Sequence, residues 1–268
     1  MPAIADLRSD LYRIPLPEVL TDSMHGTMRA FELVTARVRD ADGAEGVGYT
    51  FTVGRNGTAV LATLRDEIAE LAAGEDADAI ERLWHRLWWA MHYGGRGGPT
   101  VLALSALDMA LWDLKARRAG SPLWKLLGGF DPRVPCYAGG IDLQLPLDAL
   151  LAQTDANLGR GFRAIKMKVG RESLREDVER VAAMRAHLGD GFPLMADANM
   201  AWTVDRAVRA ARAFLLQSMA DDGLVDVLHS GDGEARYRQC VTEVHHHHLV
   251  CRNCGKAVEI GPEKILED

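Results

Sequence analysis

The sequence predicts an α/β protein of 268 residues in three parts. Alternating apolar residues and then helical spacing indicate an α+β unit over residues 1–130. Three strand-then-helix repeats over residues 131–214 are typical of a parallel sheet with crossover helices. Residues 215–268 break this rhythm, because they hold three of the four cysteines and 5 basic against 10 acidic residues, a net charge of −5. We therefore expect the tail to be a separate, β-rich segment.

The first part is predicted to begin as an antiparallel meander. Three stretches are rich in apolar and β-branched residues with near-alternation, and we assign strands to residues 3–14, 31–39 and 46–53. Asp42-Gly43 supplies a turn between the last two.

Helical spacing of apolar residues predicts three helices in the rest of this part, over residues 58–72, 78–92 and 99–118. Thr58 is expected to cap the first helix, and Pro99 suits the first turn of the third. We assign the tryptophans of the middle helix to the core: Trp84, Trp88 and Trp89.

In the second part, strands are expected at residues 134–138, 163–169 and 193–197, each followed by a helix, at 146–158, 172–188 and 203–216. Cys136 is expected to pack within the first strand.

In the tail, residues 224–229 and 234–239 predict a hairpin, and 244–250 and 256–260 predict two short strands around a Cys-x-x-Cys motif.

Composition excludes several classes of protein. The formal charge is 31 − 38 = −7, which disfavours general binding to nucleic acid or to an anionic membrane. No apolar run approaches the ~20 residues of a membrane helix, and charges within the first ten residues argue against a signal peptide. We expect a cytoplasmic protein without membrane association.

Two lysines on one predicted strand are the first candidates for chemistry. Lys166 and Lys168 are two residues apart, so period-two geometry places both ammonium groups on one face, where each lowers the pKa of the other. A lysine tuned in this way can act as a general base. Asp197 ends the next strand, where barrel enzymes hold metal ligands and catalytic groups. Two solvated lysines and a helix-capping aspartate are the alternatives.

The combination resembles a known family. Ile165–Gly170 (IKMKVG) and Pro193–Trp202 (PLMADANMAW), after the stretch SALDMALWDLK and GSPLWKLLGG, resemble the mandelate racemase/muconate lactonizing enzyme group of the enolase superfamily. The resemblance covers residues 3 to 213 and favours the sugar-acid dehydratases. It implies that residues 1–130 are a capping domain and that residues 131–214 belong to a (β/α) barrel.

The resemblance implies a mechanism in which a lysine removes the α-proton of a metal-bound carboxylate substrate and Mg²⁺ stabilises the enediolate. Lys168 would be the base, Lys166 would lie near the substrate carboxylate, and Asp197 would bind the metal. Asn199 would be an accessory polar group at the substrate, which is an acid sugar or an α-hydroxy acid. His25, in a capping-domain loop, could contact the substrate, and a solvated loop histidine is the alternative.

The departures from the family are expected to limit activity. A closed barrel of this type needs about eight strands, and only three are predicted here. The family's second and third metal-binding acids and its second acid/base residue have no counterpart. We therefore expect a truncated barrel with an incomplete Mg²⁺ site and negligible turnover, and we leave a homo-oligomer open.

The tail has a signature of its own. Residues 216–256, with His-His-His-His-Leu-Val-Cys-x-x-Cys-Gly, resemble the ferric uptake regulator superfamily, in particular its zinc-uptake members. The resemblance implies part of a winged helix and a zinc-binding β segment. It gives a Zn²⁺ site made by Asp226, Cys240, His246 and His248, and half of a second Zn²⁺ site made by Cys251 and Cys254.

Two other interpretations of the tail stay open. Four histidines in a row could be a purification tag, and Cys-x-x-Cys could be a redox pair. DNA binding is not expected, because the recognition helix is cut at its start and the tail is acidic. The two resemblances meet inside a predicted helix with no linker, so the sequence indicates a chimera of an enzyme and a metal-dependent repressor.

Overall fold

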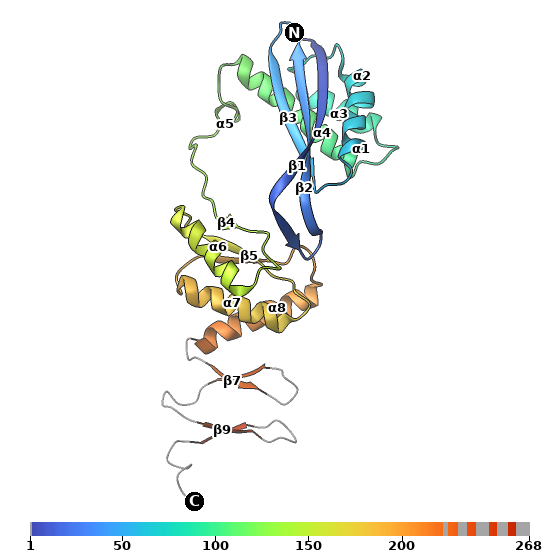
Figure 1. Ribbon diagram of the computed structural model, residues 1–268. Helices are drawn as coiled ribbons and strands as arrows, with labels where there is room; N and C mark the ends of the chain where they lie inside the picture. Colours follow the sequence, from blue (N-terminus) through green and yellow to red (C-terminus); the bar gives the residue numbers. More distant parts are fainter. Residues whose placement is uncertain (1, 222–224, 230–234, 240–246, 251–256, 261–268) are drawn as a thin grey trace, which may run out of the picture. The chain divides into compact units, whose positions relative to one another are not determined.

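The computed structural model describes residues 2–221, 225–229, 235–239, 247–250 and 257–260, and the chain divides into two compact units, Met1–Cys136 and Tyr137–Asp268 (Figure 1). Within the described residues, every helix is too short or too polar to cross a membrane.

The first unit begins with an antiparallel sheet in the order β1-β2-β3, built from β1 (Ile4–Asp22), β2 (Gly26–Asp40) and β3 (Glu45–Thr52). The predicted meander is confirmed, but its first hairpin is longer than expected. β1 continues to a turn at which Asp22 pairs with Gly26. Its register is irregular between Pro15 and Leu20, because proline has no N–H to donate to the ladder.

Helices follow where helical spacing predicts them. The first is one continuous helical stretch, made of α1 (Gly57–Ala62), a π-helical segment η1 (Thr63–Ile68) and α2 (Ala69–Ala72). After it come α3 (Ile80–Ala90), α4 (Pro99–Arg118) and the short α5 (Leu123–Leu126). The expected cap at Thr58 is wrong: Asn56 takes that position with a left-handed backbone (φ 69°) and no side-chain hydrogen bond to the helix.

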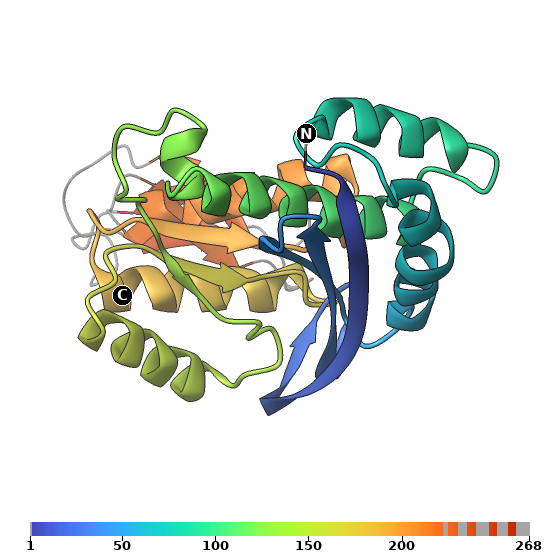
Figure 2. The same ribbon diagram turned by 90° about the horizontal axis from the view of Figure 1, so that it is seen from above.

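The core of the first unit lies between α4 and the sheet. In Figure 2 the long green helix α4 crosses the blue strands, and Leu107 and Leu111 on α4 are buried in the same cluster as Val38 on β2. Two glycines of β3 permit this approach. A Cβ atom on Gly46 would lie 2.1 Å from the carbonyl oxygen of Ala110, and one on Gly48 would lie 2.0 Å from that of Ala106.

The tryptophans of α3 are less buried than expected. The inner face of this helix is occupied by Leu83 and Leu87, which are fully buried one turn apart. Trp84 and Trp89 are 36% and 52% exposed, so their assignment to the core is wrong. Trp88 is partly buried against the core.

The second unit contains a parallel sheet in the order β4-β5-β6, with β4 (Ala138–Gly139), β5 (Ile165–Lys168) and β6 (Leu194–Asp197). A helix follows each strand: α6 (Leu147–Gly159), α7 (Leu174–Leu188) and α8 (Val204–Asp221). The three predicted strand–helix repeats are therefore confirmed. Among the described residues, its apolar core is one small cluster of six buried side chains, which includes Leu150, Met167 and Met184.

The first strand of this sheet differs from the prediction. It spans two residues instead of 134–138, because Pro132 and Pro135 interrupt the segment before it and neither has an N–H for a ladder. Cys136 is exposed, so its predicted packing is wrong.

Two antiparallel pairs lie in the tail. β7 (Val225–His229) pairs with β8 (Ala235–Gln239), as predicted for the hairpin, and β9 (His247–Val250) pairs with β10 (Ala257–Ile260). Before them, α8 runs without a break from Val204 to Asp221, beyond its predicted end at residue 216.

Candidate active site

Two lysines and one aspartate meet at the carboxyl ends of β5 and β6. The strands pair in parallel with Lys168 opposite Asp197. The ammonium Nζ of Lys168 lies 2.8 Å from Asp197 Oδ2, and that of Lys166 lies 3.1 Å from the same oxygen. The predicted shared face is therefore confirmed. Met167 lies between them on the other face and is fully buried, which fixes the direction in which the lysines point.

The two lysines differ in exposure. The side chain of Lys168 is 7% exposed and that of Lys166 is 25% exposed. The alternative of two solvated lysines is therefore wrong for Lys168. Its ammonium is held in a largely buried position by one carboxylate.

The charges stabilise one another. Hydrogen bonding to Lys168 holds the pKa of Asp197 well below its usual range, against partial burial, and the N–H of Asn199 and the ammonium of Lys166 add to this effect. Partial burial lowers the pKa of Lys166, but hydrogen bonds with Asp197 and Tyr137 outweigh it, so its pKa lies above the ordinary value. The expected lowering of the pKa by the neighbouring ammonium is therefore wrong for Lys166, because Asp197 lies between the two charges.

Asn199 lies two residues after Asp197 in an unusual conformation. It and Met200 both have left-handed backbones, with φ of 47° and 62°. Such strain is costly for residues with side chains and clusters at functional sites. The N–H of Asn199 donates to Asp197 Oδ1 (2.9 Å), and its own buried Oδ1 has no hydrogen-bond partner among the described residues. The conformation leaves one buried polar atom available beside Asp197.

His25, the other expected substrate contact, belongs to the first unit. It lies at the turn between β1 and β2, where its Nδ1 is 2.8 Å from Asp22 Oδ2. Burial raises the pKa of Asp22, but hydrogen bonds from His25 and Met24 outweigh it, so the pKa lies below its usual value. The side chain of His25 is 38% exposed.

Two residues of this neighbourhood were missed by sequence reasoning. The Nζ of Lys166 lies 5.2 Å from the ring centre of Tyr137, which precedes β4. The backbone N–H of Lys168 donates to Oδ1 of Asp142, 2.8 Å away in the loop after β4. Tyr137 directly precedes the first strand of the sheet, and no signal in the sequence pointed to it. Asp142 follows that strand, and only the rule that parallel strands end at one edge could have pointed to it.

The described residues do not make up a Mg²⁺ site by themselves. No group of three or more histidine, cysteine, aspartate or glutamate side chains suited to a metal lies within the described part of the chain. Asp197 offers one carboxylate, and both of its oxygens are engaged, one by two ammonium groups and one by the N–H of Asn199. Mg²⁺ needs near-octahedral oxygen ligands, so this donor set alone does not fit it.

Two of the six predicted zinc ligands lie within the described residues. Asp226 lies on β7, opposite Arg238, and His248 lies on β9, opposite Glu259. The other four predicted zinc ligands lie outside the described residues: Cys240, His246, Cys251 and Cys254.

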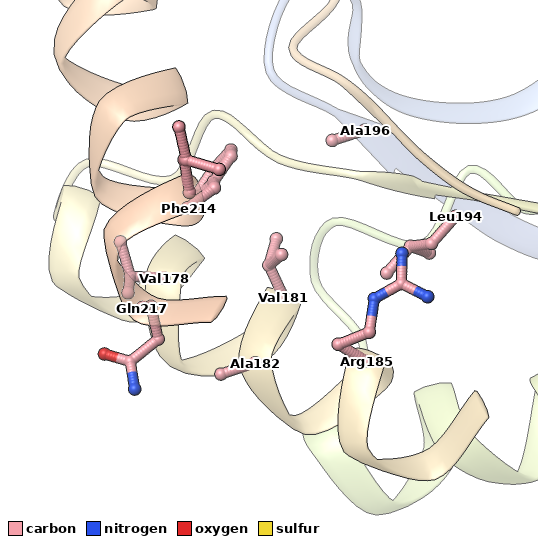
Figure 3. A pocket seen from close by; sticks show the side chains of 9 residues that line it. Val178, Val181, Ala182, Arg185, Leu194, Ala196, Phe214 and Gln217 are labelled. Carbon is pink, nitrogen blue, oxygen red and sulfur yellow. The ribbon is translucent and has the colours of Figure 1, made fainter. Parts of the chain in front are cut away.

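A cavity of about 260 Å³ lies between α7, α8 and β6 (Figure 3). Its walls are mainly apolar, with Arg185 and Gln217 as the polar members. Leu194 and Ala196 line it and alternate with Asp197 along β6, so the cavity lies on the opposite face of the sheet from the ammonium groups. It is not part of the candidate active site.

Comparison with known proteins identifies three segments. Residues 13–128 match the profile of the mandelate racemase/muconate lactonizing enzyme N-terminal domain, and residues 149–221 match that of the enolase C-terminal domain-like family. Residues 214–268 match the ferric uptake regulator family. The two kinds of match overlap within α8.

Named relatives are enzymes. A 3,6-anhydro-alpha-L-galactonate cycloisomerase from Streptomyces coelicolor is 60% identical over 210 residues, which are 78% of this chain and 58% of that protein. An L-talarate/galactarate dehydratase from Salmonella typhimurium is 42% identical over 67% of this chain and 45% of its own length. The chain thus spans roughly half to three-fifths of these relatives.

Solved structures agree. A racemase from Streptomyces coelicolor with bound magnesium superposes with a TM-score of 0.78 at 59% identity, covering 80% of this chain and 60% of that one. An L-talarate dehydratase from Polaromonas sp. JS666, complexed with Mg and L-glucarate, gives a TM-score of 0.74 at 37% identity over 80% and 59% of the two chains. Residues 13–128 and 149–221 therefore belong to the mandelate racemase/muconate lactonizing enzyme family of the enolase superfamily.

Proposed function

We propose that the chain derives from an enzyme that removes the proton α to the carboxylate of an acid sugar, as a dehydratase, racemase or cycloisomerase. The observation that carries this proposal is the convergence of Lys166 and Lys168 on Asp197 at the ends of adjacent parallel strands. The names of the relatives, which are sugar-acid dehydratases and a cycloisomerase, support the substrate class.

In this proposal Lys168 is the base. Its side chain is largely buried and is held in one position by Asp197, so its nitrogen is preorganised for proton transfer. Lys166 is more exposed and has a raised pKa, which suits a permanent cation that binds the substrate carboxylate. Asn199, whose buried Oδ1 has no hydrogen-bond partner among the described residues, would be an accessory polar group for the substrate.

The proposal includes only weak binding of Mg²⁺. Asp197 would be a Mg²⁺ ligand, and the magnesium bound in two similar structures supports this role. Since no group of three or more candidate ligand side chains forms around it within the described residues, we propose that this chain binds Mg²⁺ weakly and turns over very slowly.

The test is exchange of the α-proton in D₂O, followed by ¹H NMR across a panel of aldarates and aldonates with Mg²⁺ present. We expect slow exchange that the substitution Lys168→Met lowers about 10²-fold or more. Lys125→Met, at an exposed lysine of the first unit, is the matched control and should leave exchange unchanged. Equal exchange in both variants, or none above buffer in the unaltered chain, would refute the proposal for this chain.

We propose zinc binding as a second function, carried by the match of residues 214–268 to the ferric uptake regulator family. Asp226, Cys240, His246 and His248 would form one site with the mixed ligands that Zn²⁺ accepts. Cys251 and Cys254 would supply half of another site. This proposal does not include DNA binding.

Metal analysis of the dialysed protein tests the second function. We expect about one zinc per chain, lost on Cys240→Ser and kept on Cys136→Ser, since Cys136 is an exposed cysteine of the first unit. Retention of zinc in the Cys240→Ser chain would contradict the assigned site.

The chimeric origin is also a proposal. The enzyme match ends at residue 221 and the regulator match begins at residue 214, both inside the continuous helix α8. One unbroken DNA read across codons 200–230 of the source would establish the fusion. A break would mean that the two segments come from separate genes.

A further inference from the structure

Asp142 is a buried acid beside the candidate base. Its side chain is 2% exposed, and its Oδ1 accepts the backbone N–H of Lys168 at 2.8 Å. Burial raises the pKa of Asp142, while the N–H of Lys168 and the charges of Arg180 and Lys168 oppose that rise. A buried acceptor aimed at one backbone N–H fixes the position of that residue, because leaving either group unpaired is costly.

The loop that carries Asp142 is held by two arginines. Arg180 is 5% exposed and donates from Nη1 to the carbonyl of Leu145 (2.6 Å) and from Nη2 to that of Asp142 (3.3 Å). Arg171 donates from Nη2 to the carbonyls of Leu143 (2.9 Å) and Leu145 (3.1 Å). The loop is therefore tied to α7 and to the segment that follows β5.

The chain just beyond Lys168 is fixed from the other side. Asp177 is fully buried, and its Oδ2 accepts the N–H groups of Gly170 (2.9 Å) and Arg171 (3.1 Å). Asp142 and Asp177 thus hold the backbone at and after Lys168, and the positive charge of the buried Arg180 favours the ionised form of both acids.

Gly140 makes room for this acid. A Cβ atom at position 140 would lie 2.7 Å from Asp142 Oδ2 and 2.4 Å from Gln153 Oε1. Any larger residue would displace the carboxylate or the amide of Gln153.

We propose that Asp142 is a positioning residue for Lys168, acting through the hydrogen bond to its backbone N–H. The inference rests on the proposed function for its catalytic consequence, but the positioning itself is a property of the fold. It predicts that loss of the carboxylate moves the nitrogen of Lys168 away from the place where it meets the substrate, without changing the groups that bind substrate.

The first test does not need turnover. In the full chain labelled with ¹⁵N, we expect the Lys168 amide to exchange with solvent about tenfold faster or more in Asp142→Leu, and within about threefold of the unaltered rate in Asp142→Asn, which keeps an acceptor. Thr154→Val is the control, because Thr154 is equally buried but bonds only within α6 and to Met184. An unchanged Lys168 amide in Asp142→Leu would overturn the inference.

A second variant keeps the test decisive if Asp142→Leu does not fold. Gly140→Ala leaves the acid in place but crowds it, and it should shift the Lys168 amide signal. Gly159→Ala, where a Cβ meets nothing within 4 Å, should leave that signal in place. Equal, small shifts at Lys168 in both variants would also overturn the inference.

The catalytic arm separates this inference from the proposed function. We expect Asp142→Leu to lower kcat for α-proton exchange up to about 10²-fold with KM nearly unchanged, and Asp142→Asn to restore most of kcat. If the unaltered chain shows no exchange but the amide result holds, the positioning stands and the proposed reaction fails. A rise in KM with kcat unchanged would show that Asp142 does not act through the base.

Discussion

The two units bury their polar groups in different ways. In the first unit a large apolar core fills the space between α4 and the sheet, and a buried acid, Asp40, is bound by Arg118 at 2.7 Å. Among the described residues of the second unit, the apolar core cluster has six buried members, and they lie beside a network of buried charged groups, namely Lys168, Asp142, Asp177 and Arg180. Apolar packing dominates the first unit, whereas hydrogen bonds fix the reactive groups of the second.

This contrast has a physical consequence. Apolar burial is non-directional and roughly proportional to area, so it stabilises a fold without fixing any one atom to a fraction of an ångström. Hydrogen bonds between buried charged groups have strict geometry, and breaking one leaves an unpaired group at a high cost. A unit that must hold a base near a substrate benefits from the second kind of interaction.

The largest expected loss of stability comes from a substitution at the contact between β3 and α4. Gly48→Ala would place a Cβ atom 2.0 Å from the backbone oxygen of Ala106, so α4 would have to move off the sheet. We expect a loss above about 4 kcal/mol, enough to unfold the first unit, measured by thermal unfolding followed by circular dichroism.

Gly97→Ala is the control for this prediction, because a Cβ there meets nothing within 4 Å and the backbone is not left-handed. A Gly48→Ala chain that melts within a degree or two of the unaltered protein would show that the first unit is not packed as tightly as the structure indicates.

A smaller effect is expected from single cavities in the two cores. Leu111→Ala and Met184→Ala each remove a fully buried side chain, and each should cost about 2–5 kcal/mol of unfolding free energy. Hydrogen exchange should locate the damage: faster exchange at β2 amides for Leu111→Ala, and at β5 amides for Met184→Ala.

Leu127→Ala, at a side chain 60% exposed, should change stability by less than about 0.5 kcal/mol. If Met184→Ala proves as mild as Leu127→Ala, the apolar core of the second unit contributes little, and the polar network carries most of its stability.

The fold was largely predictable because periodicity reports which face is buried. The meander, α4 and the three strand–helix repeats all follow from apolar spacing. The tryptophans of α3 show the limit of that signal, since both leucines and tryptophans recur at helical spacing and only packing decides that Leu83 and Leu87 face inward.

The site was predictable only where two functional residues share a strand or end neighbouring strands. Lys166, Lys168 and Asp197 meet that condition, and their proximity is confirmed. Asp142 was missed because its hydrogen-bond partner is a backbone N–H. Every residue except proline has such a group, so the sequence does not indicate which one an acid binds. The pKa of Lys166 was predicted in the wrong direction, because the carboxylate that separates the two ammonium groups comes from another strand.

The smallest expected effect on stability is the pH dependence that Asp197 gives to the second unit. Asp197 has a pKa held low in the folded protein, chiefly by Lys168, and an unfolded aspartate titrates near pH 3.9. The stability contributed by its ionised form is therefore fully present above about pH 4 and is lost as the pH falls towards the folded pKa.

At pH 6 we expect Asp197→Asn to be less stable by about 1 kcal/mol, since the carboxylate is 30% exposed and solvent weakens the pair. Urea unfolding from pH 6 to pH 3 should show this difference shrinking, while Asp205→Asn, whose exposed pair with Arg209 is 2.9 Å long, should stay within a few tenths of a kcal/mol throughout. A more stable Asp197→Asn chain at pH 6 would mean that the three charges are strained against one another, and that the second unit holds them for chemistry at the expense of its own stability.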